Sequence, residues 1–144
     1  MSNNLFSLYE YADQRCIDVD WFDLVQAPSL SLPLADGSCA IAINPWKMVT
    51  VADEKVALAH ELGHCETGSF YNQYAALDIR QKHEHRADKW AIERLIPASA
   101  LDQAVADGCA EMWQLAEHFG VTIEFMKKAV CWHTHGNLAT ELYF

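Results

Sequence analysis

The feature that most constrains this chain is the stretch His60-Glu61-Leu62-Gly63-His64, which falls within a predicted helix. Residues four apart on an α-helix lie one turn apart on the same face, so both imidazoles can reach one metal ion. Glu61 lies about 100° further round the helix than His60, where its carboxylate can hold a water molecule without binding the metal. This H-E-x-x-H spacing is typical of zinc metallopeptidases.

The residues around the motif favour a metal site over an exposed helix that happens to carry two histidines. The helix is apolar on nearly every side, through Val56, Ala57, Leu58, Ala59 and Leu62, and should therefore be buried. Two imidazoles and a carboxylate are costly to bury without partners. A metal ion supplies those partners.

Size and charge limit the classes of protein to which the chain can belong. A length of 144 residues with 51% apolar content predicts one domain, 1–144, with the helices of about 98–135 as a helical subregion. The formal charge of −10 opposes nonspecific binding to nucleic acid or to anionic membranes. No basic and apolar leader is seen at the N-terminus, and no apolar run is long enough to span a bilayer.

The cysteines indicate a reducing compartment. They number five, which is odd, and no C-x-x-C occurs, so we expect neither a disulfide framework nor a structural zinc knuckle. Reduced thiols and a cytoplasmic location follow as expectations.

Periodicity and punctuation predict an α+β fold, mostly helical, with a small N-terminal sheet packed on the H-E-x-x-H helix. Thr50 and Asp53 predict a capping-box start for that helix, and Pro28 and Pro33 indicate a loop or irregular edge. Strands are expected at 16–19 and 38–43, the second as an ordinary sheet strand or as an edge strand able to hold an extended substrate. Helices are expected from residue 5 to about 12 and at about 51–64, 79–95, 98–108, 110–119 and 123–132.

A catalytic zinc needs a third protein ligand besides the two histidines. Glu84 is favoured, because a loop and a return helix fit between it and His64, and Ala87 and Ala91 on its face allow a close approach of the two helices. Asp88, one turn further on, can accept a hydrogen bond from a ligand histidine. The other interpretation of this helix is a solvated charged face. The remaining candidates are Glu66, Asp78, His83, His85, His133 and His135.

The motif together with Glu84-x-x-Ala87-Asp88-x-x-Ala91 and Leu95-Ile96-Pro97 resembles the ImmA/IrrE family of metallopeptidases. A helical tail resembling the family's is present at 115–122. The resemblance implies a zincin-like, gluzincin-type site in which His60, His64 and Glu84 hold Zn²⁺, Glu61 is catalytic and Asp88 supports a ligand. It also implies a compact mobile-element or phage type, whose partner is a helix-turn-helix repressor that it cleaves.

The function expected from the sequence is therefore a cytoplasmic zinc endopeptidase acting on a regulatory protein. Glu61 would take a proton from water and pass it to the leaving amine. A second donor to the oxyanion is needed, and Tyr71, Tyr74, His83, His85 and His135 are its candidates. The alternatives are a catalytically weak zinc-binding interaction protein and a DNA-binding helix-turn-helix module at 115–130, although direct nucleic-acid binding is not expected from so acidic a chain.

Overall fold

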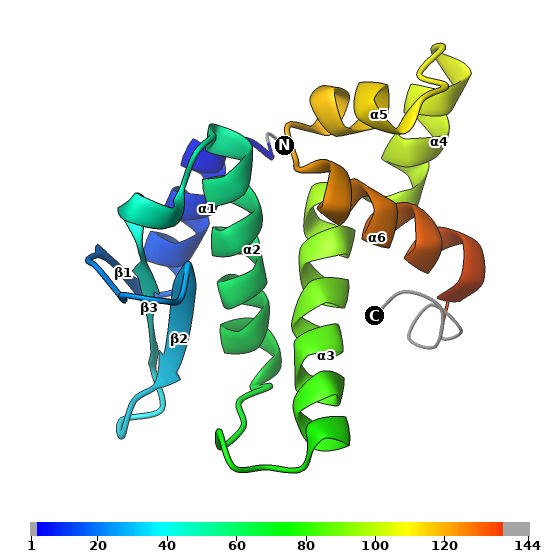
Figure 1. The fold of residues 1–144 in the computed structure, drawn as a ribbon. Coiled ribbons are helices and arrows are strands. Elements are labelled where there is room, and N and C mark those ends of the chain that lie inside the picture. Colours follow the sequence, from blue (N-terminus) through cyan, green and yellow to red (C-terminus); the bar gives the residue numbers. More distant parts are fainter. Residues whose placement is uncertain (1–2, 137–144) are drawn as a thin grey trace.

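The computed structural model describes residues 3–136 and is mostly helical, with one small sheet, as predicted (Figure 1). The strands are β1 (Asp18–Trp21), β2 (Ser29–Pro33) and β3 (Cys39–Ile43), and a 3-10 turn, η1 (Pro45–Lys47), follows. The helices are α1 (Leu5–Gln14), α2 (Val51–Thr67), α3 (Leu77–Leu95), α4 (Ala98–Ala106), α5 (Met112–Phe119) and α6 (Ile123–His135). Within residues 3–136, none of these helices combines the length and hydrophobicity that a membrane span requires.

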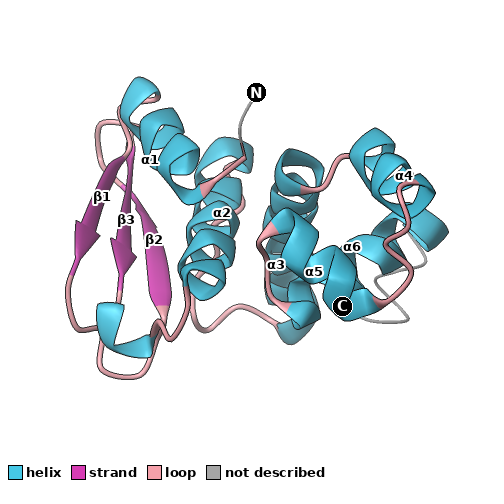
Figure 2. Ribbon diagram, turned by 90° about the horizontal axis from the view of Figure 1, so that it is seen from above, coloured by secondary structure: helices cyan, strands magenta, loops and turns pink. Residues whose placement is uncertain are grey.

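The elements stack in layers, and the sheet forms one side of the molecule (Figure 2). Helices α1 and α2 cover one face of the sheet, α3 lies antiparallel beside α2, and α4, α5 and α6 pack beyond α3 (Figures 1 and 2). The apolar core joins these layers through fully buried side chains from α1, β3, α2, α3 and α6, namely Leu8, Ile41, Ile43, Leu58, Leu62, Ile92, Leu95 and Met126. The core therefore fixes α2 between the sheet and α3.

The strand order is β1-β3-β2, with β3 parallel to β1 and antiparallel to β2. Of the two interpretations of 38–43, the ordinary sheet strand is confirmed and the edge strand is wrong, because β3 lies in the centre. The sequence interpretation missed β2, since two prolines bracket it. Hydrogen bonds from Asn44 to the carbonyl of Pro28 and from Leu34 to the carbonyl of Ser38 close the two ends of the β2–β3 pair.

The alternation of an antiparallel ladder explains why proline is tolerated in β2. Residues 28 and 34 bond to the residues that flank β3, so residues 30 and 32 bond to β3 itself. Residues 29, 31 and 33 direct their backbone groups to the opposite edge. Pro33 thus occupies a position that needs no N–H donor. Ser29 and Ser31 direct their backbone N–H and C=O groups to the same edge.

The cysteines correct a second prediction. Cys39, at the start of β3, forms a disulfide with Cys65 in the last turns of α2, and Cys16, Cys109 and Cys131 are free. An odd number of cysteines does not exclude one bond, and packing of α2 on the sheet brings together two residues that are 26 apart in sequence. The expectation of fully reduced thiols is wrong for this pair, and the thiols no longer support a cytoplasmic location.

Local boundaries also differ from the predictions. The first strand begins two residues later than expected, because Cys16 has a left-handed backbone with φ 58° and ends the preceding turn. Helix α2 continues to Thr67 and ends at Gly68, whose φ of 65° stops the helix. The metal-site motif is consequently helical throughout, with His64 in the last turn of α2.

Candidate metal centre

The start of α2 is fixed by a complete capping box, as predicted. Thr50 accepts a hydrogen bond from the backbone N–H of Asp53, and the Asp53 carboxylate accepts one from the backbone N–H of Thr50. These bonds satisfy two of the orphan donors at the helix start and set the phase of the following turns. His60 and His64 then lie one turn apart on the face directed at α3.

Gly63 allows α3 to approach this face very closely. A Cβ atom placed on Gly63 would lie 2.4 Å from the carbonyl oxygen of Ala87 and 2.9 Å from its Cα atom, so nothing larger than glycine fits there. Ala87 itself is fully buried. The contact places Glu84, one turn before Ala87, level with the two histidines of α2.

Three side-chain ligand atoms converge between α2 and α3. The Nε2 atom of His60 lies 2.7 Å from one oxygen of Glu84, and the Nε2 atom of His64 lies 3.3 Å from the other. The two Nε2 atoms are 3.2 Å apart. Among the residues that the structure describes, this is the one group of histidine, cysteine and acidic side chains close enough together to hold a metal ion.

The other ring nitrogens of the two histidines have acceptors that favour metal binding. Nδ1 of His60 donates to Asp88 at 2.7 Å, and Nδ1 of His64 donates to the backbone carbonyl of Ser69 at 2.6 Å. Because each Nδ1 carries the proton in this arrangement, each Nε2 keeps its lone pair for a metal. The donor set therefore fits a metal ion that accepts two imidazoles and one carboxylate.

The charges of the cluster stabilise one another. Burial alone would lower the pKa of His60, but its bonds to the Asp88 and Glu84 carboxylates outweigh burial and raise that pKa to about 10. Burial alone would raise the pKa of Glu84, but its bonds to His60, His64 and Tyr71 hold that pKa well below the usual range. Without a metal, the cluster is thus an imidazolium held between two carboxylates.

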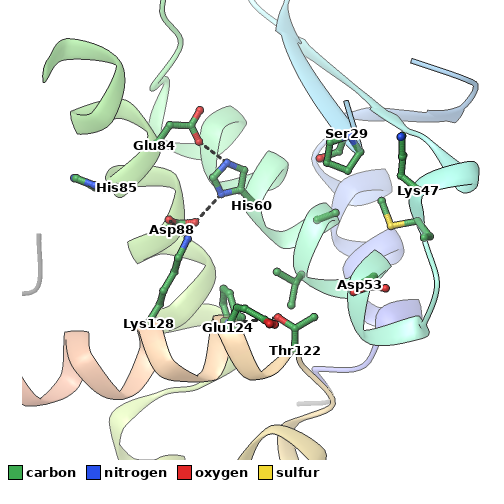
Figure 3. A pocket seen from close by; sticks show the side chains of 15 residues that line it. Ser29, Lys47, Asp53, His60, Glu84, His85, Asp88, Thr122, Glu124 and Lys128 are labelled. Carbon is green, nitrogen blue, oxygen red and sulfur yellow. Dashed lines mark hydrogen bonds and ion pairs between the residues drawn. The ribbon is translucent and has the colours of Figure 1, made fainter. Parts of the chain in front are cut away.

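Helix α6 contributes a further partner. The ammonium group of Lys128 lies 3.2 Å from the Asp88 oxygen that does not contact His60 (Figure 3). Asp88 is buried, and its pKa is lowered by His60 and Lys128 against the effect of burial. The orientation of His60 is therefore coupled through Asp88 to the C-terminal helices.

Two more side chains stand beside the ligand atoms. Glu61 is buried, and one of its oxygens accepts a 2.7 Å hydrogen bond from the hydroxyl of Ser29 on β2. The hydroxyl of Tyr71 donates to Glu84 at 2.6 Å, and burial together with this bond raises the pKa of Tyr71 to about 12. A neutral tyrosine remains a hydrogen-bond donor throughout the physiological pH range.

The remaining sequence candidates lie outside this cluster. Glu66 binds Tyr11 and Arg15, and His133 donates to the carbonyl of Ile96 at the end of α3. His83 stacks on Tyr71, with 6.0 Å between ring centroids. Asp78 and His135 lie at the far ends of α3 and α6, Tyr74 is 87% exposed, and His85 lines an adjoining cavity.

Sequence reasoning missed three residues that contact the site, namely Ser29, Ser69 and Lys128. Ser29 was missed together with its strand, and Lys128 lies in the segment 115–130, which was considered only as a possible DNA-binding module. Ser69 carried a weak signal, because it follows the glycine that ends α2 and its backbone turns back towards that helix.

Comparison with known proteins agrees with this geometry. A model of the peptidase family described as the IrrE N-terminal-like domain matches residues 22–130, which contain every residue of the cluster. Searches of curated proteins and of solved structures find no significant match.

Proposed function

Because the chain belongs to the ImmA/IrrE family of metallopeptidases, we propose that it is a zinc-dependent endopeptidase of the two-histidine, one-glutamate type. The observation that carries the proposal is the convergence of His60, His64 and Glu84, with both Nδ1 atoms already committed to acceptors. Two nitrogen ligands and one carboxylate, with room for a fourth ligand, are characteristic of catalytic zinc.

Bound zinc would supply a Lewis acid that polarises the scissile carbonyl and lowers the pKa of water. Glu61 would take the proton from the attacking water and deliver it to the leaving amine. Its bond to Ser29 holds one carboxylate oxygen and leaves the other available for the proton. Asp88 and the Ser69 carbonyl would keep the two imidazoles oriented throughout.

Among the five sequence candidates for the second oxyanion donor, Tyr71 is the best placed. Its hydroxyl touches the Glu84 carboxylate, so a small rotation brings it to a carbonyl oxygen held at the site. Its raised pKa keeps the proton on the hydroxyl. Tyr71 would thus stabilise negative charge that develops on the substrate oxygen.

The strand that receives the substrate would be β2 rather than β3. Ser29 and Ser31 direct their N–H and C=O groups to the open edge, and both serines line the cavity that contains Glu61 and His64. An extended peptide paired with this edge would pass across the ligand atoms. The pairing would give affinity without selecting a sequence.

The substrate we propose is a cytoplasmic helix-turn-helix repressor, as the family resemblance suggests. The alternative of a DNA-binding module at 115–130 is weaker, because Lys128, one of the two lysines of α6, is paired with Asp88. The Glu61→Gln experiment below also tests the alternative of a zinc-binding protein without activity.

The variant Glu61→Gln tests the function. It should keep zinc, because Glu61 is not among the converging ligand atoms, and it should lose about 10²–10⁴-fold in peptide hydrolysis. Zinc content is measured by mass spectrometry of the native protein, and cleavage is measured on a purified repressor and on a peptide mixture. Glu66→Gln is the matched control, since Glu66 sits on the same helix and binds Tyr11 instead. Undiminished hydrolysis by the Glu61 variant would refute its role, and no hydrolysis by the zinc-loaded parent would favour the inactive alternative.

A further inference from the structure

Two cavities meet at the metal cluster, one on each side of it. The larger has a volume of about 530 Å³ and borders His60 and Glu84, and the smaller has about 290 Å³ and borders His64, Glu61 and Glu84. Ser29, at the start of β2, lines both. A peptide lying over the cluster would therefore place residues from either side of the scissile bond in different cavities.

One wall of the larger cavity, formed largely by α2 beside His60, is apolar. Val56 and Ala57 precede His60 by four and three residues, so they lie one turn along the same face of α2. Met48 from the segment after η1 and Phe125 from α6 complete the apolar walls. Ala57 leaves space where a longer side chain would fill the cavity.

Charged residues also line this cavity, and several already have partners within the protein. Asp88 is bonded to His60 and Lys128 (Figure 3), and Asp53 accepts bonds from the backbone at the start of α2. The smaller cavity has no counterpart of the Val56 and Ala57 wall beside the ligands. Its lining there is Ser29, Ser31, Ser69, Tyr71 and Gln73, although Leu30 and Phe70 also border it. The two sides of the cluster thus offer different environments to a substrate.

The direction of β2 assigns the two sides. The strand runs from Pro28, beside the larger cavity, to Ser31, beside the smaller one. A substrate paired antiparallel to β2, which is the slightly more stable arrangement, runs the other way. Its residue after the scissile bond then reaches the larger cavity.

We propose that the larger cavity selects a large apolar side chain on the residue that follows the scissile bond, with Ala57 and Val56 setting its size. This specificity rests on the proposed peptidase function. The residue before the scissile bond faces the polar cavity and is small or polar. The substrate class is accordingly a protein with an exposed segment in which a polar residue precedes a leucine-like or aromatic one.

The test measures binding, so it does not depend on turnover. The probes are three succinyl hydroxamates that share a zinc-binding group and differ in the side chain standing for the residue after the scissile bond: methyl, isobutyl or benzyl. Their affinities for the zinc-loaded protein are measured by calorimetry. Burial of three additional carbons should make isobutyl bind about 50-fold tighter than methyl.

The variants locate the effect. Ala57→Leu should reduce the isobutyl preference to less than about 5-fold, because the new side chain occupies the volume that three probe carbons would fill. Ala106→Leu, on the exposed end of α4, is the matched control and should keep the parent preference. Val56→Ala should instead shift the preference towards benzyl, which provides a second reading if the first variant folds poorly.

Each outcome separates this proposal from the proposed function. Equal affinities for the three probes, no binding by zinc-loaded protein, or a preference unchanged in both cavity variants would overturn the specificity. The expected preferences without any peptide hydrolysis would support the cavity assignment and count against the peptidase function. Hydrolysis without a size preference would support the peptidase function and count against the cavity assignment.

Discussion

Adding a single methyl group at Gly63 should disturb both the fold and the metal centre. Gly63→Ala places a Cβ atom 2.4 Å from the carbonyl oxygen of Ala87, and ordinary contact begins at 3.4 Å. The two helices must therefore separate by about 1 Å at this point, because the obstructing atoms belong to the backbone of α3 and cannot rotate away. Glu84 and Asp88, carried by α3, move with it.

Two opposing contributions set the size of the effect on stability. Overpacking of this kind costs about 3 kcal/mol at the upper end of the usual range. Replacement of glycine by alanine within a helix stabilises the folded state by about 1 kcal/mol. We expect a net loss of about 2 kcal/mol in the free energy of unfolding of the metal-free protein. A displacement of about 1 Å at the ligands should also lower hydrolysis by about 10²-fold.

The stability loss is measured by urea unfolding of the metal-free protein, and the zinc affinity by competition with a chelator. The double variant Gly63→Ala, Ala87→Gly is an informative control. It should not recover zinc affinity, because the contact is with the Ala87 backbone and not with its side chain. An unchanged zinc affinity and an unfolding free energy equal to or above the parent's would refute the close-approach argument, and so would full recovery in the double variant.

Three further predictions concern the disulfide, the support of His60 and the effect of pH. Replacing Cys39 and Cys65 by serine should lower the unfolding free energy by about 3.5 kcal/mol, because the disulfide closes a loop with a sequence separation of 26. Thiol titration of the unfolded parent should find three free thiols without reductant and five with it. Asp88→Ala should weaken zinc binding by about 10–100-fold in chelator competition, with partial recovery in Asp88→Asn, and an unchanged affinity would contradict the support of His60 by Asp88. Because the folded metal-free protein raises the pKa of His60 from 6.5 to about 10, its imidazolium stabilises the fold fully below pH 6.5 and progressively less as the pH rises to about 10. The difference in unfolding free energy between the parent and His60→Gln should shrink over that interval, and a growing difference would disprove the sign.

Local sequence signals predicted much of what lies within single elements. The apolar periodicity around His60 indicated a buried helix, and Thr50 with Asp53 predicted its start, because both signals depend on residues within one or two turns. The Glu84 to Asp88 spacing predicted which face of the next helix meets the metal motif, since the helical repeat fixes which residues share a face. Strand β2 was not predicted, because the effect of a proline depends on which edge of the ladder its missing N–H would occupy.

The sequence by itself determined that His60 and His64 lie one turn apart on one helix face, and it made Glu84 the favoured third ligand. The tertiary structure decided what surrounds them. Ser29 on β2, Lys128 on α6 and the partner of Cys65 are distant along the chain, and only packing of the layers brings them to α2. Such contacts depend on how whole elements pack against one another, and the spacing of residues within one helix does not determine that packing.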